Sequence, residues 1–135
     1  MTLHHDIARK LAEAGIPLTS QRLLIACELF AEHCHLSADE LLLRVGSLTP
    51  DISRATVYNT LKLFSQKGLV QELVVDNGKR VYDSNTAPHP HCYNADTGEL
   101  TDVHQPLQLA GPLPELPPGT ALERVDIIVR VRNVA

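Results

Sequence analysis

The sequence is poor in cysteine, and its three cysteines do not form pairs. Cys27, Cys34 and Cys92 are widely spaced and make no Cys-x-x-Cys motif, so the sequence indicates neither a disulfide framework nor a thiolate zinc knuckle. It also lacks an apolar run long enough to cross a bilayer. The N-terminus has no basic region followed by an apolar stretch, as a secretory signal would. We therefore expect a cytoplasmic protein without a membrane partner.

The chain also lacks the overall positive charge that is typical of nucleic-acid-binding proteins. Its net charge is −4, but the acidic excess lies mainly in the C-terminal part. Residues 1–83 contain 9 basic and 10 acidic side chains, whereas residues 84–135 contain 3 and 6. Residues 53–67 carry three cations and no acid. Such a local basic patch is enough to contact phosphates, because affinity follows the patch more than the total charge.

The first half of the chain has apolar residues at helical spacing, separated by capping and breaking signals. Ser37 and Glu40 have the spacing of a capping box. These signals predict four helices. The first covers residues 5–14, the second is capped by Thr19 or Ser20, and the third runs from Ser37 through Leu43. The fourth is capped by Ser53 and ends at Gly68, and its inner face carries Val57, Leu61 and Phe64.

A hairpin signal follows the helices. Two apolar runs, residues 69–75 and 79–83, flank an Asn77-Gly78 turn. Helices followed by a hairpin are the order of a winged helix-turn-helix. The predicted fold class is therefore α+β, with a winged-helix DNA-binding domain over residues 1–83 and a hinge over 84–88.

The remaining residues, 89–135, predict a small, proline-rich second domain. Two short strands are expected at about 89–95 and 99–103, and residues 105–119 hold five of the nine prolines, which argues against a long helix there. Residues Val125–Val134 predict a buried strand. A unit this small rarely holds a core alone, so we expect a homodimer in which this strand pairs across the two-fold axis.

Two histidines stand one residue apart at the start of this second domain. On a strand, His89 and His91 would point to the same face, and Asp102 returns on the next strand. Together they could form half of a metal site. Alone, such histidines are more often surface or hydrogen-bonded side chains, and we take His4, His5, His33 and His104 to be solvent-exposed.

The ordered set of motifs resembles the ferric uptake regulator (Fur) superfamily of bacterial metal-dependent repressors. The matching segments are residues 18–22, 35–41, 52–61 and 68–70, together with the His89/His91 pair. Residues 55–59 (Ala-Thr-Val-Tyr-Asn) and 96–100 (Asp-Thr-Gly-Glu-Leu) are most similar to the peroxide-responsive repressors and the iron response regulators.

The resemblance implies two functional residue sets. One divalent metal per subunit, Fe(II) or Mn(II) with Zn(II) as an alternative, would be held by three imidazoles and two carboxylates: His35, Asp83, His89, His91 and Asp102. Double-stranded operator DNA would be contacted by Arg22, Arg54, Thr56, Tyr58 and Asn59. Metal binding would set the angle between the domains and hence the spacing of the recognition helices.

The chain also departs from its relatives. Asn94 and Thr97 stand where a first Cys-x-x-Cys pair would be, so no structural zinc bound by four cysteines is expected. Pro88 and Pro90 occupy positions that serve a further metal site in relatives. Haem remains an alternative without a motif of its own, because there is no Cys-Pro dipeptide and Pro90 interrupts the histidines.

Several functions remain open at this point. The resemblance and the aspartate at 102 favour a repressor that senses peroxide by oxidation of His35 or His89, with Cys92 as a competing thiol. An iron- or haem-responsive regulator and a metal-independent winged-helix DNA binder are the alternatives. An oxygen-activating enzyme is disfavoured, because five protein ligands leave little room for substrate.

Overall fold

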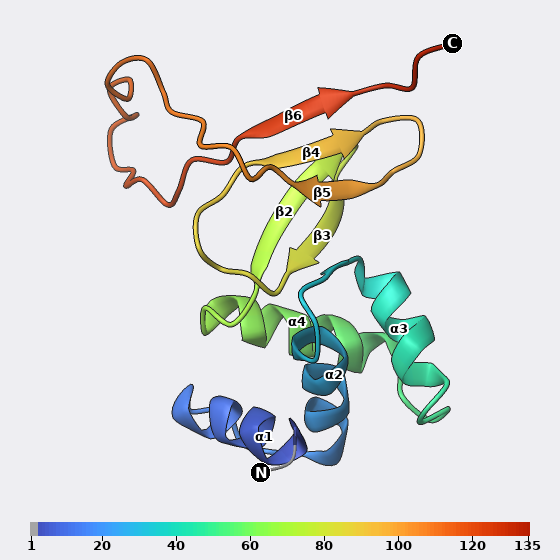
Figure 1. Ribbon diagram of the computed structural model, residues 1–135. Coiled ribbons are helices and arrows are strands. Elements are labelled where there is room, and N and C mark those ends of the chain that lie inside the picture. The colour runs from blue at the N-terminus through green and yellow to red at the C-terminus, as the bar shows by residue number, and fades with distance from the viewer. Residues whose placement is uncertain (1–2) are drawn as a thin grey trace. The chain divides into compact units, whose positions relative to one another are not determined.

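The computed structural model describes residues 3–135, which form two compact units, one ending at Ala87 and the other beginning at Pro88 (Figure 1). The α+β class, with a winged-helix unit followed by a small second unit, is confirmed. No described helix has the length and apolar character that a membrane span requires.

The first unit contains the four predicted helices, α1 (Leu3–Glu13), α2 (Ser20–Phe30), α3 (Ala38–Gly46) and α4 (Arg54–Gln66). Thr19, Ser37 and Ser53 cap the last three, and each accepts a hydrogen bond from the backbone N–H three residues on. The Ser37–Glu40 capping box is complete. Gly68 takes a φ of 75° just after α4, a left-handed conformation that favours glycine and ends the helix.

The sheet of the first unit has three strands in the order β1-β3-β2. The predicted hairpin is present as β2 (Gln71–Asp76) and β3 (Lys79–Asp83), and Asn77 and Gly78 both have positive φ values in its turn. Sequence reasoning missed β1 (His35–Leu36), because two residues give no periodicity. This short strand pairs antiparallel with β3 and places His35 opposite Asp83.

One hydrophobic core holds the helices of the first unit together. Phe64 and Leu61 on α4 are fully buried, as are Leu11 on α1, Leu29 on α2 and Leu41 on α3. The predicted inner face of α4 is therefore confirmed. Because α4 buries this face, its opposite face is the one that remains available to a partner.

The second unit is a three-stranded sheet of β4 (His91–Asn94), β5 (Leu100–Asp102) and β6 (Ile128–Val131), in the order β5-β4-β6. β4 pairs antiparallel with β5 and parallel with β6. Between β5 and β6 the described chain forms no helix, as the prolines predicted. In Figure 1 this segment is the long orange loop.

The expectation of a buried strand over Val125–Val134 was wrong. β6 covers only four of these residues, and Val125, Val129 and Val134 are 47%, 41% and 95% exposed. The reason is that β6 is an edge strand and no helix of the unit's described chain packs on it. The apolar pattern is real, but within the described part of one copy Ile127 and Ile128 are only half-buried and the valines remain exposed.

Candidate metal centre and nucleic-acid interface

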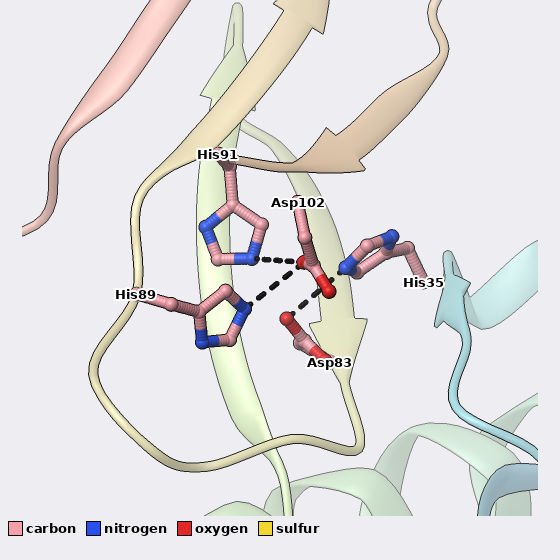
Figure 2. A group of neighbouring side chains, drawn as sticks. All are labelled: His35, Asp83, His89, His91 and Asp102. Carbon is pink, nitrogen blue, oxygen red and sulfur yellow. Dashed lines mark hydrogen bonds and ion pairs between the residues drawn. The ribbon is translucent and has the colours of Figure 1, made fainter. Parts of the chain in front are cut away.

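The first unit holds a buried carboxylate paired with an imidazole. The register of β1 and β3 places His35 opposite Asp83, and Nε2 of His35 lies 3.1 Å from Oδ2 of Asp83 (Figure 2). Asp83 is completely buried, and its Oδ1 accepts a hydrogen bond of 2.9 Å from the backbone N–H of Asn85. These partners offset the cost of burying the carboxylate and fix its orientation.

His33 is a second imidazole beside the same carboxylate, which sequence reasoning missed. Its side chain is 43% exposed, as expected, but Nδ1 lies 3.6 Å from Oδ1 of Asp83. Its ring meets the ring of His35 edge-on, with centroids 5.1 Å apart. The spacing of His33 and His35 equals that of His89 and His91, and that similarity was the available signal. Asp83 thus faces one imidazole at each oxygen.

The second unit holds two imidazoles around one carboxylate. Strand pairing places His91 opposite Asp102, and Oδ1 of Asp102 lies 3.0 Å from Nε2 of His89 and 3.5 Å from Nε2 of His91. Figure 2 shows the three side chains pointing toward one another from β4, from β5 and from the loop before β4. His91 is 1% exposed, whereas His89 is 13% exposed and Asp102 16%.

Both groups have the chemistry of a metal site. Within each unit, the donor atoms lie within 4.8 Å of one another. Imidazole nitrogen and carboxylate oxygen together suit Fe(II), Mn(II) and Zn(II). Because buried imidazoles and carboxylates are costly unless they are paired or bind a metal, their convergence fits a site for a divalent cation.

A small apolar cavity adjoins His89. It has a volume of about 140 Å³ and is lined, besides His89, by Pro88, Pro90, Leu107, Val125 and Ile127. The two prolines that alternate with the histidines therefore form part of its wall. The imidazole of His89 is also the more exposed of the pair.

Cys92 is separated from the histidines by the geometry of β4. Burial alternates along the strand, with His91 and Tyr93 on the buried side and Cys92 between them half-buried. Neighbouring side chains of a strand point to opposite faces, so Cys92 points away from His91. Cys34 is partly buried, and this burial raises the pKa of its thiol.

The predicted DNA-contacting residues lie on or beside the outer face of α4. Arg54, Tyr58 and Asn59 are exposed, and Thr56 is half-buried. Arg22, at the start of α2, donates a 2.7 Å hydrogen bond to the carbonyl of Pro17. It shares with Thr56 and Asn59 a hollow of about 280 Å³. A second hollow, of about 550 Å³, is lined by Tyr58, Lys79 and Arg80 among others.

Arg54 is not a freely available cation. Its guanidinium is paired with the carboxylate of Asp39 in the first turn of α3. The pKa of Arg54 is raised, first because Asp39 accepts a hydrogen bond from it and then because of the charge of Asp39, with a smaller effect of Tyr58. Sequence reasoning gave no sign of this pair, because the two residues belong to different helices.

Comparison with known proteins gives one consistent result. Residues 13–111 match the ferric uptake regulator family. The chain is 33% identical over 108 residues to the peroxide-responsive repressor PerR of Staphylococcus epidermidis. The matched region covers 78% of this chain and 72% of that protein. PerR of Staphylococcus aureus (strain Mu50) is also 33% identical, with 73% of that protein covered.

Solved structures agree with the sequence matches. The ferric uptake regulator from Pseudomonas aeruginosa with manganese is 25% identical, with a TM-score of 0.68 over 94% of this chain and 97% of that one. PerR from Streptococcus pyogenes, described for peroxide sensing and gene regulation, is 28% identical, with a TM-score of 0.54 over 76% of this chain and 70% of that one.

Proposed function

Because the chain belongs to the ferric uptake regulator family, we propose that it is a metal-dependent transcriptional repressor that binds operator DNA as a homodimer and senses peroxide. The observation that carries this proposal is the pairing of imidazoles with carboxylates at the predicted ligand positions in both units. A repressor needs no substrate pocket, and the two hollows described above lie beside α4, where DNA would bind.

His35 and Asp83 from the first unit would bind one divalent ion together with His89, His91 and Asp102 from the second. The length of the connecting segment supports this shared binding. Only five residues separate Asp83 from His89, and a segment of that length spans at most about 20 Å. The second half-site is therefore held at a high effective concentration near the first. An ion that takes ligands from both would fix one unit against the other, which couples metal binding to the placement of α4 on DNA.

Peroxide sensing would depend on ferrous iron, which supplies the electrons that activate hydrogen peroxide. The ligand imidazoles are the nearest oxidisable side chains. His89 is the more exposed imidazole of the second unit and borders the 140 Å³ cavity. Oxidation there would remove a ligand and release the repressor from DNA. The thiol of Cys92 lies on the other face of β4, so it does not compete directly.

Homodimerisation would cover the exposed apolar side chains around β6. Val125, Val129 and Val131 are between 37% and 47% exposed, and β6 lies at an edge of its sheet. Edge strands with unpaired backbone groups are templates for another strand. A second copy of the chain offers the same edge, so the two could pair about a two-fold axis.

The test is operator selection followed by metal and peroxide titration. The purified protein with Mn(II) selects a duplex from a random-sequence pool, and binding to that duplex is measured for apo, Mn(II) and anaerobic Fe(II) forms. We expect both metals to switch on binding, and peroxide to abolish only that of the iron form while adding oxygen to a peptide with His35 or His89. Equal binding by apo-protein would refute metal dependence, and a peroxide-insensitive iron form would leave an iron or manganese regulator.

A further inference from the structure

Two arginines on the predicted DNA-binding surface of the first unit are already paired with acids. Arg54 pairs with Asp39, and the two side chains are 61% and 65% exposed. On the hairpin, Nε of Arg80 lies 3.4 Å from Oε1 of Glu72. Arg54 is the first residue of α4 and Asp39 lies on α3, so their pair joins two different helices.

The position of Asp39 makes this pair unusual for a DNA-binding surface. Asp39 lines the 550 Å³ hollow together with Tyr58, Lys79 and Arg80, so its carboxylate lies where a DNA strand would pass. A carboxylate repels phosphates there. In the first turn of α3 the negative charge of Asp39 interacts favourably with the helix dipole, whereas the positive charge of Arg54 in the first turn of α4 interacts unfavourably with the dipole of that helix. Asp39 thus compensates an unfavourable cation and weakens general attraction to DNA.

We propose that Asp39 competes with DNA for Arg54, which keeps this cation from binding phosphates indiscriminately and lowers the affinity of the surface for every duplex. This inference rests on the proposed DNA-binding function. A phosphate offers Arg54 the same kind of anionic partner that Asp39 already supplies, so non-specific DNA gains little from exchanging one for the other. A guanine edge offers two acceptors, O6 and N7, in the geometry of the guanidinium fork, together with the contacts of Tyr58 and Asn59. Only a matching sequence therefore compensates for breaking the Asp39 pair.

In this arrangement every DNA complex that uses Arg54 must first break its pair with Asp39. Without the carboxylate, Arg54 would be available to any phosphate, and binding to unrelated DNA would become tighter and more dependent on salt. Operator binding would tighten by a similar factor, because the wild type must break the Asp39 pair before Arg54 contacts a base and the variant need not. The affinity for DNA in general is therefore the quantity that Asp39 controls.

The experiment compares Asp39→Asn with the wild type, both as full chains with Mn(II). The probes are the duplex that the wild-type protein selects from a random pool and a scrambled duplex of the same composition. We expect scrambled DNA to bind about fivefold tighter, the size of one screened unit-charge interaction at contact distance. The slope of log K against log salt should steepen by about 0.9 for that duplex, which corresponds to one added phosphate contact. The operator affinity should rise by a similar factor.

The matched controls separate the pair from general electrostatics. Asp51→Asn removes the same charge from an exposed residue between α3 and α4, and it should leave both affinities close to those of the wild type. In an Arg54→Gln background, Asp39→Asn should have a clearly smaller effect on scrambled DNA, because the pair is already absent and only the repulsion between the carboxylate and phosphates is left to remove. Thermal melting and Mn(II) titration establish that each variant is folded and loaded.

The outcomes are distinct. Unchanged binding of Asp39→Asn to scrambled DNA would overturn the inference, as would an equal effect in the Arg54→Gln background, which would show general repulsion. Loss of operator binding alone would also overturn it, because Asp39 would then support the specific complex. If the wild type with metal selected no duplex at all, the proposed function itself would fail.

Discussion

Asp102 is the residue whose replacement tests the proposed metal centre most directly. Its Oδ1 faces both imidazoles of the second unit, at 3.0 and 3.5 Å, so it would contribute the carboxylate of the proposed half-site. Asp102→Asn keeps the shape of the side chain but removes its charge. We expect the fold of the apo-protein to persist, because the amide can still hydrogen-bond, and the Mn(II) affinity to fall.

The size of the loss follows from the surroundings of Asp102. The side chain is 16% exposed, so water reaches the site and screens it. A unit charge at 4 Å contributes about 4 kcal/mol at an effective dielectric constant of about 20, and a water that enters as replacement ligand recovers part of that. We therefore expect a loss of about 2.7 kcal/mol, or about 100-fold in Kd.

Thermal melting converts this loss into a measurable shift. At Mn(II) of about 100 times the wild-type Kd, binding stabilises the fold by about 2.7 kcal/mol, and a 100-fold weaker variant retains about 0.4 kcal/mol. Since about 1 kcal/mol shifts Tm by about 3–4 °C in a chain of this size, the metal-induced shift should fall from roughly 9 °C to about 1–2 °C. Glu99→Gln, which removes an exposed acid in the same unit, is the control. A wild-type shift in Asp102→Asn would refute the assignment of Asp102 as a ligand.

Three further predictions test the surroundings of the proposed site and the packing of the two units. His33→Gln should weaken Mn(II) binding by about tenfold without abolishing it, because the His33 ring lies beside Oδ1 of Asp83 and helps to position that carboxylate. An isothermal titration that gives the wild-type Kd would contradict this positioning role. Phe64→Ala removes a fully buried side chain from the core of the first unit, and it should lower the free energy of unfolding by about 3–5 kcal/mol in urea titrations. Leu43 is 78% exposed, so Leu43→Ala should change this free energy by less than about 0.5 kcal/mol in the same assay. Asn94→Ala should destabilise the second unit by about 1–3 kcal/mol, because the Asn94 side chain donates a hydrogen bond to the side chain of Asn133 and accepts hydrogen bonds from the backbone N–H groups of Asp96 and Thr97. Hydrogen exchange of the residues after Pro88 should become faster, and unchanged exchange would contradict the prediction.

Local signals in the sequence predicted the first unit well. Capping at Thr19, Ser37 and Ser53 depends on residues within three positions of one another, and the Asn77-Gly78 turn is equally local. The inner face of α4 follows from helical periodicity. All of these features are encoded by neighbours in the sequence, so they could be identified without knowing the tertiary structure.

Features that depend on distant residues could not be identified in this way. The pairing of β1 with β3, the approach of His33 to Asp83 and the Arg54–Asp39 pair join residues that are 15 or more positions apart. The predicted ligand set came from a family resemblance and not from spacing alone. The apolar pattern of Val125–Val134 was correctly seen, but its burial was wrongly inferred, because periodicity does not tell whether the same chain or another copy covers a strand.

The two units differ in how much stability they can supply themselves. The first has buried side chains from all four of its described helices, whereas the buried side chains of the described second unit are Tyr93, Leu100 and His91. So small a core rarely sustains a fold alone. Since His91 is both part of this core and a proposed ligand, the free energy of metal binding is in part folding free energy. The metal would therefore order the second unit as well as orient it, so the response to metal and the pairing of β6 across a dimer would be thermodynamically linked.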